Sequence, residues 1–267
     1  MQYGCLPAKK DYRDYTICSS AVLNVEYPKE FILENLPAVK QQDNINSCCA
    51  HALSSILEYF NNNKHTLSTN FIYGIQHKEF NQNLPGMYLA QACQIVQKYG
   101  DVLEQDCPGN IEVPNSWTAA EAVINNQQAM EEGYKYRTTS YYTCNTDNDI
   151  KYALMNYGPV LAAIDWKEKY SISKTGKIRF SKTSSGGGHA VMVCGWNKSG
   201  WVIQNSWGSD WGKEGRFILP FEYGFLEARA IIDYEDDQDI ALKKPVNNRV
   251  FNIFYKAANY LANFSKH

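Results

Sequence analysis

The sequence of 267 residues lacks the features that mark binding to nucleic acids or to membranes. It carries no basic run, and its formal net charge is -2 with a pI of about 6.2. Nucleic acids and anionic membranes attract basic surfaces, so neither is an expected partner. No apolar stretch approaches the roughly 20 residues that cross a bilayer, and we expect no membrane span.

Signals for export and for metal binding are also missing. The first twenty residues have no apolar core of a secretory signal peptide, so the default expectation is an intracellular, cytoplasmic protein. The eight cysteines contain no CxxC pair, and we expect neither a metal nor another cofactor. Cys93 and Cys194 lie among core-type residues, which predicts buried, reduced thiols.

The composition is that of a globular protein, with 44% hydrophobic and 20% charged residues. We interpret residues 1–26 as a polar, tyrosine-rich arm and residues 27–233 as the folded body. Residues 234–267 form an acidic linker and then an apolar stripe at helical spacing. Packing on its own domain, or fraying, explains that stripe better than partner or membrane binding does.

The periodicity of the body changes from helical to strand-like along the chain. Apolar residues predict helices over 47–60, 86–99 and 147–157, with Ser47 and Asp147 as N-caps. Short β-rich runs follow at 160–164, 190–195, 201–204 and 216–219. Helices followed by strands are typical of an α+β fold with segregated lobes.

Cys48 opens the best of these helices. A helix N-terminus and a nearby imidazolium both favour the thiolate, which is the reactive form of a cysteine. Most cysteines are merely buried, and Cys49, about 100° further round the helix, fits that description. Cys48 stands out because His189, Asn205 and Gln42 are present as well.

His189 follows three glycines that leave room for a substrate backbone, and it would exchange a proton with the thiol. Asn205 would fix the tautomer of its ring, and Trp207 would shield that bond from water. Gln42 would stabilise a tetrahedral oxyanion together with the backbone N–H of the nucleophile. His51 competes for the role of base, but it lies near the apolar stripe and is interpreted as structural.

Several motifs, taken in order, resemble those of the papain-like cysteine peptidases. They are Val39-Lys40-Gln41-Gln42, Ser47-Cys48, Gly158-Pro159-Val160, His189-Ala190-Val191 and Gln204-Asn205-Ser206-Trp207-Gly208, continuing through Trp211-Gly212. The resemblance covers about residues 27–233. It implies a helical left lobe, a right lobe resembling an antiparallel β-barrel, and an active-site cleft between them. It also implies that Cys48 is the nucleophile, His189 the base and acid, Asn205 its orienter and Gln42 the oxyanion donor.

The N-terminal arm is most similar to that of the xylellain-like branch of this family. That branch carries a short segment in place of a long pro-domain, so we expect residues 1–26 to lie across the cleft and restrain activity. Three positions depart from the family pattern. Ile45 replaces a disulfide cysteine, Cys49 replaces a tryptophan, and Pro85-Gly86 replaces a glycine pair of the substrate groove.

The leading hypothesis is a cysteine endopeptidase that cleaves peptides or proteins through a Cys48 thioester. A transpeptidase or amidase with the same nucleophile, and a silent peptide-binding scaffold, remain as alternatives. Position relative to the motifs predicts a set of substrate-binding residues: Gly86, Met87, Tyr88, Ala163, Gly188 and Trp207.

Overall fold

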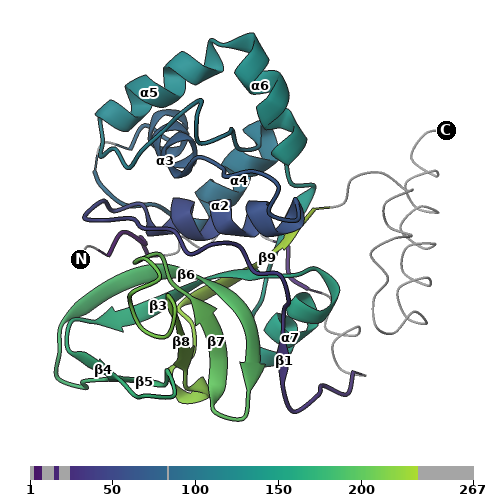
Figure 1. Cartoon of the computed structure of the whole chain (residues 1–267), viewed down its shortest axis with the longest axis vertical. Helices are drawn as coiled ribbons and strands as arrows, with labels where there is room; N and C mark the ends of the chain where they lie inside the picture. Colours follow the sequence, from purple (N-terminus) through teal and green to yellow (C-terminus); the bar gives the residue numbers. More distant parts are fainter. Residues whose placement is uncertain (1–2, 8–14, 18–24, 83, 234–267) are drawn as a thin grey trace.

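The computed structural model describes residues 3–7, 15–17, 25–82 and 84–233. Within these ranges the chain forms a helical lobe and a sheet lobe that pack against each other (Figure 1). The expected α+β, two-lobed fold is therefore confirmed. The apolar stripe predicted within residues 234–267 lies outside the described residues.

The helical lobe is built around α2. Its helices are α2 (Cys48–Phe60), α3 (Thr69–Glu79), α4 (Leu89–Tyr99), α5 (Asn115–Ile124) and α6 (Gln127–Gly133), followed by the 3-10 turn η1 (Tyr134–Tyr136). Phe71, Ile75, Ile95 and Ala120 from α3, α4 and α5 form an apolar core. Among the described residues, no helix is long and apolar enough to cross a membrane.

The sheet lobe is antiparallel. Its strands are β1 (Phe31–Ile32), β2 (Ser140–Thr143), β3 (Val160–Lys167), β6 (Gly186–Asn197), β7 (Gly200–Gln204), β8 (Arg216–Leu219) and β9 (Glu227–Ile232). Their order is β2-β9-β3-β6-β7-β8, with β1 on β6. Over the described strands this is an open sheet and not a closed barrel. The hairpin of β4 (Tyr170–Ile172) and β5 (Ile178–Phe180), α7 (Asp147–Asn156) and the turn η2 (Phe221–Tyr223) complete the lobe.

An apolar cluster joins the two lobes. It includes Leu53 and Ile56 from α2, together with Leu161, Ala190 and Met192 from the sheet. Because α2 is packed on both sides, all but one of its residues are buried. This packing fixes the N-terminus of α2 beside the middle of β6.

Several element boundaries and caps differ from the sequence-based expectations. Helix α4 begins at Leu89 and not at Gly86, because Gly86 has a φ of 105°, which no helix accommodates. The cap of α7 was predicted wrongly: Thr146, not Asp147, caps it through a capping box with Asp149. Ser47 holds the N-cap position of α2 without a capping hydrogen bond from its side chain.

The N-terminal arm touches the body at two places in its described parts. Tyr3 to Pro7 runs between the two lobes, where Figure 1 shows a purple trace. Further on, Thr16 forms a bridge with Thr143 of β2. The described parts of the arm, residues 3–7 and 15–17, therefore lie on the folded body.

Candidate active site

Cys48 is the first residue of α2 and is fully buried. Burial alone would raise the pKa of its thiol. Hydrogen bonds from Cys49 and His189, the charge of the His189 ring and the N–H of Ala190, which donates to Sγ over 3.4 Å, outweigh burial. The pKa of Cys48 therefore lies well below its usual value, and the thiolate is the favoured form.

His189 lies in β6, fully buried, with Nε2 2.7 Å from Oδ1 of Asn205. That same oxygen accepts the backbone N–H of Ser206 over 2.9 Å, so it must be an acceptor toward the ring as well. Nε2 therefore carries hydrogen and donates to Asn205. The opposite nitrogen, Nδ1, is buried and has no hydrogen-bond partner among the described residues, so it is the nitrogen left to exchange a proton with Cys48, whose pKa the ring lowers.

Two indole rings enclose this pair. Trp207 lies with its ring centroid 4.7 Å from that of His189 at an interplanar angle of 31°, and Trp166 lies edge-on at 5.3 Å. The rings exclude water from the His189–Asn205 bond, which strengthens it. Trp166 was not singled out from sequence, because only the register of β3 against β6, pairing Trp166 with Gly187, brings it here.

Gln42 is buried in the loop before α2, where Ser206 holds it from two sides. The Gln42 N–H donates to the Ser206 carbonyl over 2.8 Å, and the Ser206 hydroxyl donates to Gln42 Oε1 over 2.6 Å. Its Nε2 donates to the carbonyl of Ile45 over 2.9 Å. Ser206 was missed as a site residue, although it stands within the Asn205-Ser206-Trp207 motif.

His51 has the structural role that the sequence predicted. It is buried, and its Nδ1 contacts the carbonyl of Ser47 at 3.0 Å and the hydroxyl at 3.2 Å. Burial lowers the pKa of His51 to about 4, so the ring is neutral near pH 7. A neutral imidazole occupied by Ser47 leaves His189 as the base beside Cys48.

This arrangement agrees with what comparison with known proteins finds. The sequence model of one protein family, papain family cysteine protease, matches residues 30–222, which is well over half of the chain. The chain belongs to the papain family of cysteine proteases.

Individual relatives are distant. The chain is 27% identical over 205 residues to viral cathepsin of Adoxophyes honmai nucleopolyhedrovirus, covering 72% of this chain and 57% of that protein. It is 37% identical over 105 residues to a cathepsin B-like cysteine proteinase of Schistosoma japonicum, covering 35% of this chain and 31% of that protein. The chain thus spans a third to just over half of the length of these relatives.

Solved structures share the fold. Xylellain, a cysteine protease from Xylella fastidiosa, superposes with a TM-score of 0.73 at 22% identity, covering 87% of this chain and 96% of that one. The proCathepsin B S9 of Trypanosoma congolense gives a TM-score of 0.64 at 17% identity, covering 87% of both chains.

In this member of the papain family, the N-terminal arm fills the expected cleft. Cys5 donates its N–H to the carbonyl of Gly188 over 2.9 Å. On the other side, Met87 donates to the carbonyl of Gly4 over 2.6 Å, and Leu6 donates to the carbonyl of Met87 over 2.7 Å. The segment thus pairs as a strand, antiparallel to Gly188 and parallel to Met87.

Four of the predicted substrate-binding residues lie beside the arm or in the apolar cluster of Cys5, and the other two lie elsewhere. Gly188 and Met87 pair with the arm, and a Cβ on Gly86 would lie 2.9 Å from the Gly4 carbonyl oxygen. Ala163 belongs to the same apolar cluster as Cys5. Two more have other positions: Tyr88 is the half-buried N-cap residue of α4, and Trp207 covers His189.

Sequence reasoning missed the two arm residues closest to the reactive pair. The Tyr3 ring lies edge-on to His189 at 6.4 Å, and its Cβ lies 3.3 Å from where a Cβ on Gly187 would be. Cys5 is buried in the cluster that contains Cys48. Neither has a sequence signal of its own, because the arm becomes a strand only through its partners.

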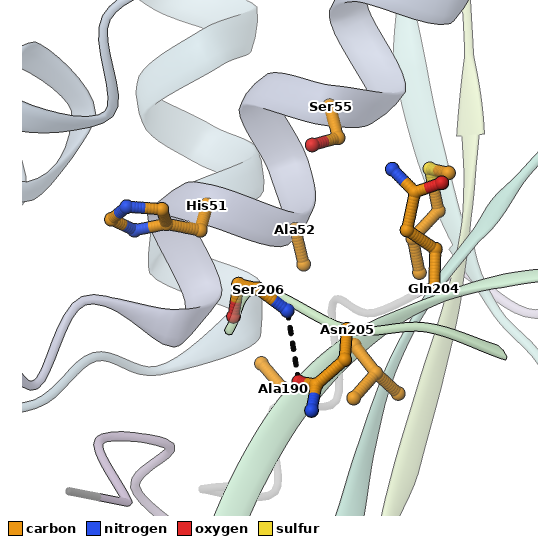
Figure 2. Close-up of a pocket in the computed structure, with 9 residues that line it drawn as sticks. His51, Ala52, Ser55, Ala190, Gln204, Asn205 and Ser206 are labelled. Atoms are coloured by element: carbon orange, nitrogen blue, oxygen red, sulfur yellow. Dashed lines mark hydrogen bonds between the residues drawn. The ribbon is translucent and has the colours of Figure 1, made fainter. Parts of the chain in front are cut away.

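A small cavity of about 10 Å³ lies behind Asn205, between α2 and the strands β6 and β7 (Figure 2). Figure 2 shows the Ser206 N–H bonded to Asn205 across from Ala52 and Ser55 of α2. The cavity has room for roughly one water and none for a peptide side chain.

Proposed function

We propose that this protein is a cysteine endopeptidase in which Cys48 is the nucleophile. The observation that carries the proposal is the chain of contacts from Cys48 through His189 to Asn205, buried at the N-terminus of α2. The thiolate attacks the carbonyl carbon of a peptide bond and forms a C–S bond. His189, protonated at Nδ1, gives that proton to the leaving amine.

The thioester that remains is hydrolysed in a second step. His189 takes a proton from water, the resulting hydroxide attacks the thioester, and the released sulfur becomes the thiolate again. Each step passes through an oxyanion. The Cys48 N–H, which has no acceptor within the first turn of α2, and Nε2 of Gln42, which carries two hydrogens, are its proposed donors.

The described part of the arm leads us to propose self-inhibition. Residues 4–6 pair with Gly188 on one side and with Met87 on the other, Tyr3 lies edge-on to His189, and Cys5 lies in the apolar cluster of Cys48. Two of the similar solved structures are proforms, the proCathepsin B S9 of Trypanosoma congolense and the ragweed pollen allergen Amb a 11. A peptide or protein substrate would have to displace the arm before it reaches Cys48.

Cleavage of a peptide library tests the proposal. Cys48→Ala should abolish every cleavage, while Cys144→Ala, which removes a buried thiol of the sheet lobe, should retain the wild-type pattern. Adding a primary amine separates hydrolysis from transpeptidation, because a transpeptidase would transfer the acyl group to that amine. Cleavage that persists in Cys48→Ala would refute the assignment of the nucleophile.

A further inference from the structure

Three cysteine side chains meet at the junction of the arm, the cleft and α2. Cys5, Cys48 and Cys49 are all buried and belong to one apolar cluster. Cys49 is the middle member, because its side chain interacts with that of Cys5 and with that of Cys48. All three are free thiols.

The backbone holds Cys5 and Cys49 against the same residue. Cys5 forms a bridge with Met87, flanked by the hydrogen bonds of Gly4 and Leu6. The Cys49 thiol donates to the carbonyl of Met87 over 3.5 Å. The opposite side of Cys5 is fixed by Gly188, where a Cβ would lie 2.3 Å from the Cys5 carbonyl oxygen. Cys5 therefore cannot shift away from Cys49 without breaking the pairing of the arm.

We propose that Cys5 and Cys49 form a reversible disulfide that fastens the arm over Cys48. Cys49 is chosen over Cys48 because its sulfur lies against Met87, the residue that Cys5 pairs with, whereas Cys48 interacts with His189. The inference rests on the proposed self-inhibition and adds a redox condition to it. Only when the disulfide is reduced can the arm leave the cleft.

The oxidant is a low-molecular-weight disulfide such as oxidised glutathione. When the arm swings out, the exposed Cys5 thiolate attacks the glutathione disulfide, forming a mixed disulfide and releasing one glutathione thiolate. When the arm returns to the cleft, Cys49 loses its proton and attacks the Cys5 sulfur of the mixed disulfide. This attack releases a second glutathione thiolate. Two protein thiols are oxidised and one glutathione disulfide is reduced to two thiols, so the exchange balances.

The bond also changes the surroundings of Cys48. In the reduced protein, Cys49 is one of the hydrogen-bond partners that lower the pKa of Cys48. A sulfur in a disulfide carries no hydrogen and can no longer donate to Cys48. The oxidised state therefore covers the nucleophile and also withdraws one group that stabilises its thiolate.

Disulfide mapping in the full-length Cys48→Ala variant tests the bond apart from any peptidase activity. The variant is equilibrated with defined ratios of reduced to oxidised glutathione, quenched with acid and iodoacetamide, and digested for tandem mass spectrometry. We expect a linked pair of peptides containing Cys5 and Cys49. The link should vanish in Cys5→Ser and persist in Cys18→Ser, whose cysteine lies outside the described residues.

The same mapping on the chain with Cys48 present decides between the neighbouring thiols. A link from Cys5 to Cys48, or no link from Cys5 at any ratio, overturns the proposal. We expect oxidation to lower peptide cleavage roughly tenfold or more, because a tethered arm rebinds as an intramolecular ligand, and dithiothreitol to restore it. A Cys5–Cys49 link with unchanged cleavage refutes the redox control alone. No cleavage by the reduced protein, in the wild type and in Gly4→Ala alike, refutes the proposed function.

Discussion

At the residue scale, the state of the Cys48 sulfur depends on two opposing effects. Full burial disfavours a charged sulfur, and yet the pKa of Cys48 lies well below its usual value. The favourable contacts come from different parts of the chain: Cys49 beside it, the Ala190 N–H, and the His189 ring that Asn205 orients. The reactivity of this thiol therefore depends on the two lobes remaining docked.

His189→Ala should shift the pH dependence of Cys48 alkylation upward. Only the thiolate reacts with iodoacetamide. The usual pKa of a cysteine thiol is 9.0, and the lowered pKa of Cys48 keeps this thiol reactive well below that pH. Without the His189 ring, less opposes the effect of burial, which raises the pKa of Cys48. The midpoint of the pH dependence of labelling should therefore rise by about 1–3 pH units. The measurement is the rate of iodoacetamide labelling against pH, in a Gly4→Ala background that opens the cleft. Identical midpoints with and without His189 would contradict this account.

Gln42→Ala should lower kcat by about 10²–10³-fold, because it removes one proposed donor to the oxyanion. Labelling of Cys48 by iodoacetamide should change little, since alkylation forms no oxyanion. Gln41→Ala is the matched control, because Gln41 is the exposed neighbour in the same loop. Steady-state cleavage and labelling rates are compared for the two variants. A Gln42→Ala enzyme with full kcat would remove Gln42 from the mechanism.

At the scale of elements, the described start of the arm pairs like a short strand with residues on both sides of it. Residues 4–6 form backbone hydrogen bonds with Gly188 on β6 and with Met87 before α4. Gly4 is at the tightest point, because a Cβ there would lie 2.0 Å from the carbonyl oxygen of Asn46. That contact gives a way to displace the arm without truncating the chain.

Gly4→Ala should raise the rate of peptide cleavage. Forcing a methyl group into this contact costs about 1–3 kcal/mol in the arm-bound state, which corresponds to a gain of about 5- to 150-fold in the population of the open state. Pro7→Ala, at an exposed position just beyond the paired segment, is the control and should leave the rate unchanged. Equal rates in Gly4→Ala and the wild type would show that the arm does not limit access.

The cap of α7 offers a test within the sheet lobe. Thr146→Ala removes the hydroxyl that accepts the Asp149 N–H over 3.1 Å, and should lower the free energy of unfolding by about 1 kcal/mol. Asp147→Ala, one residue further on, should cost less because Asp147 does not cap the helix. Urea denaturation of the two variants measures the difference, and the reverse order would refute the assignment of the cap.

At the scale of the whole molecule, the order of the motifs predicted the reactive residues that the fold brings together. Cys48 and Ala190 meet although they are 142 positions apart. The α+β class and the two lobes also followed from the change in periodicity, because helices and strands occupy separate halves of the body. The limits of the three regions and the cytoplasmic location remain predictions.

Several of the features that the sequence did not predict arise from long-range pairing. Trp166 reaches His189 only through the register of β3 on β6, and the glycines Gly186 to Gly188 extend β6 beyond its apolar run. Cys5 and Tyr3 lie in a polar arm with no period of its own.

Labelling with a thiol-reactive peptidyl epoxide, followed by intact mass, tests the central claim most directly. The account predicts a single adduct on Cys48, formed faster in Gly4→Ala than in the wild type and absent in Cys48→Ala. An adduct of the same rate in Cys48→Ala, or peptide cleavage by that variant, would contradict the claim that Cys48 is the nucleophile beneath the arm.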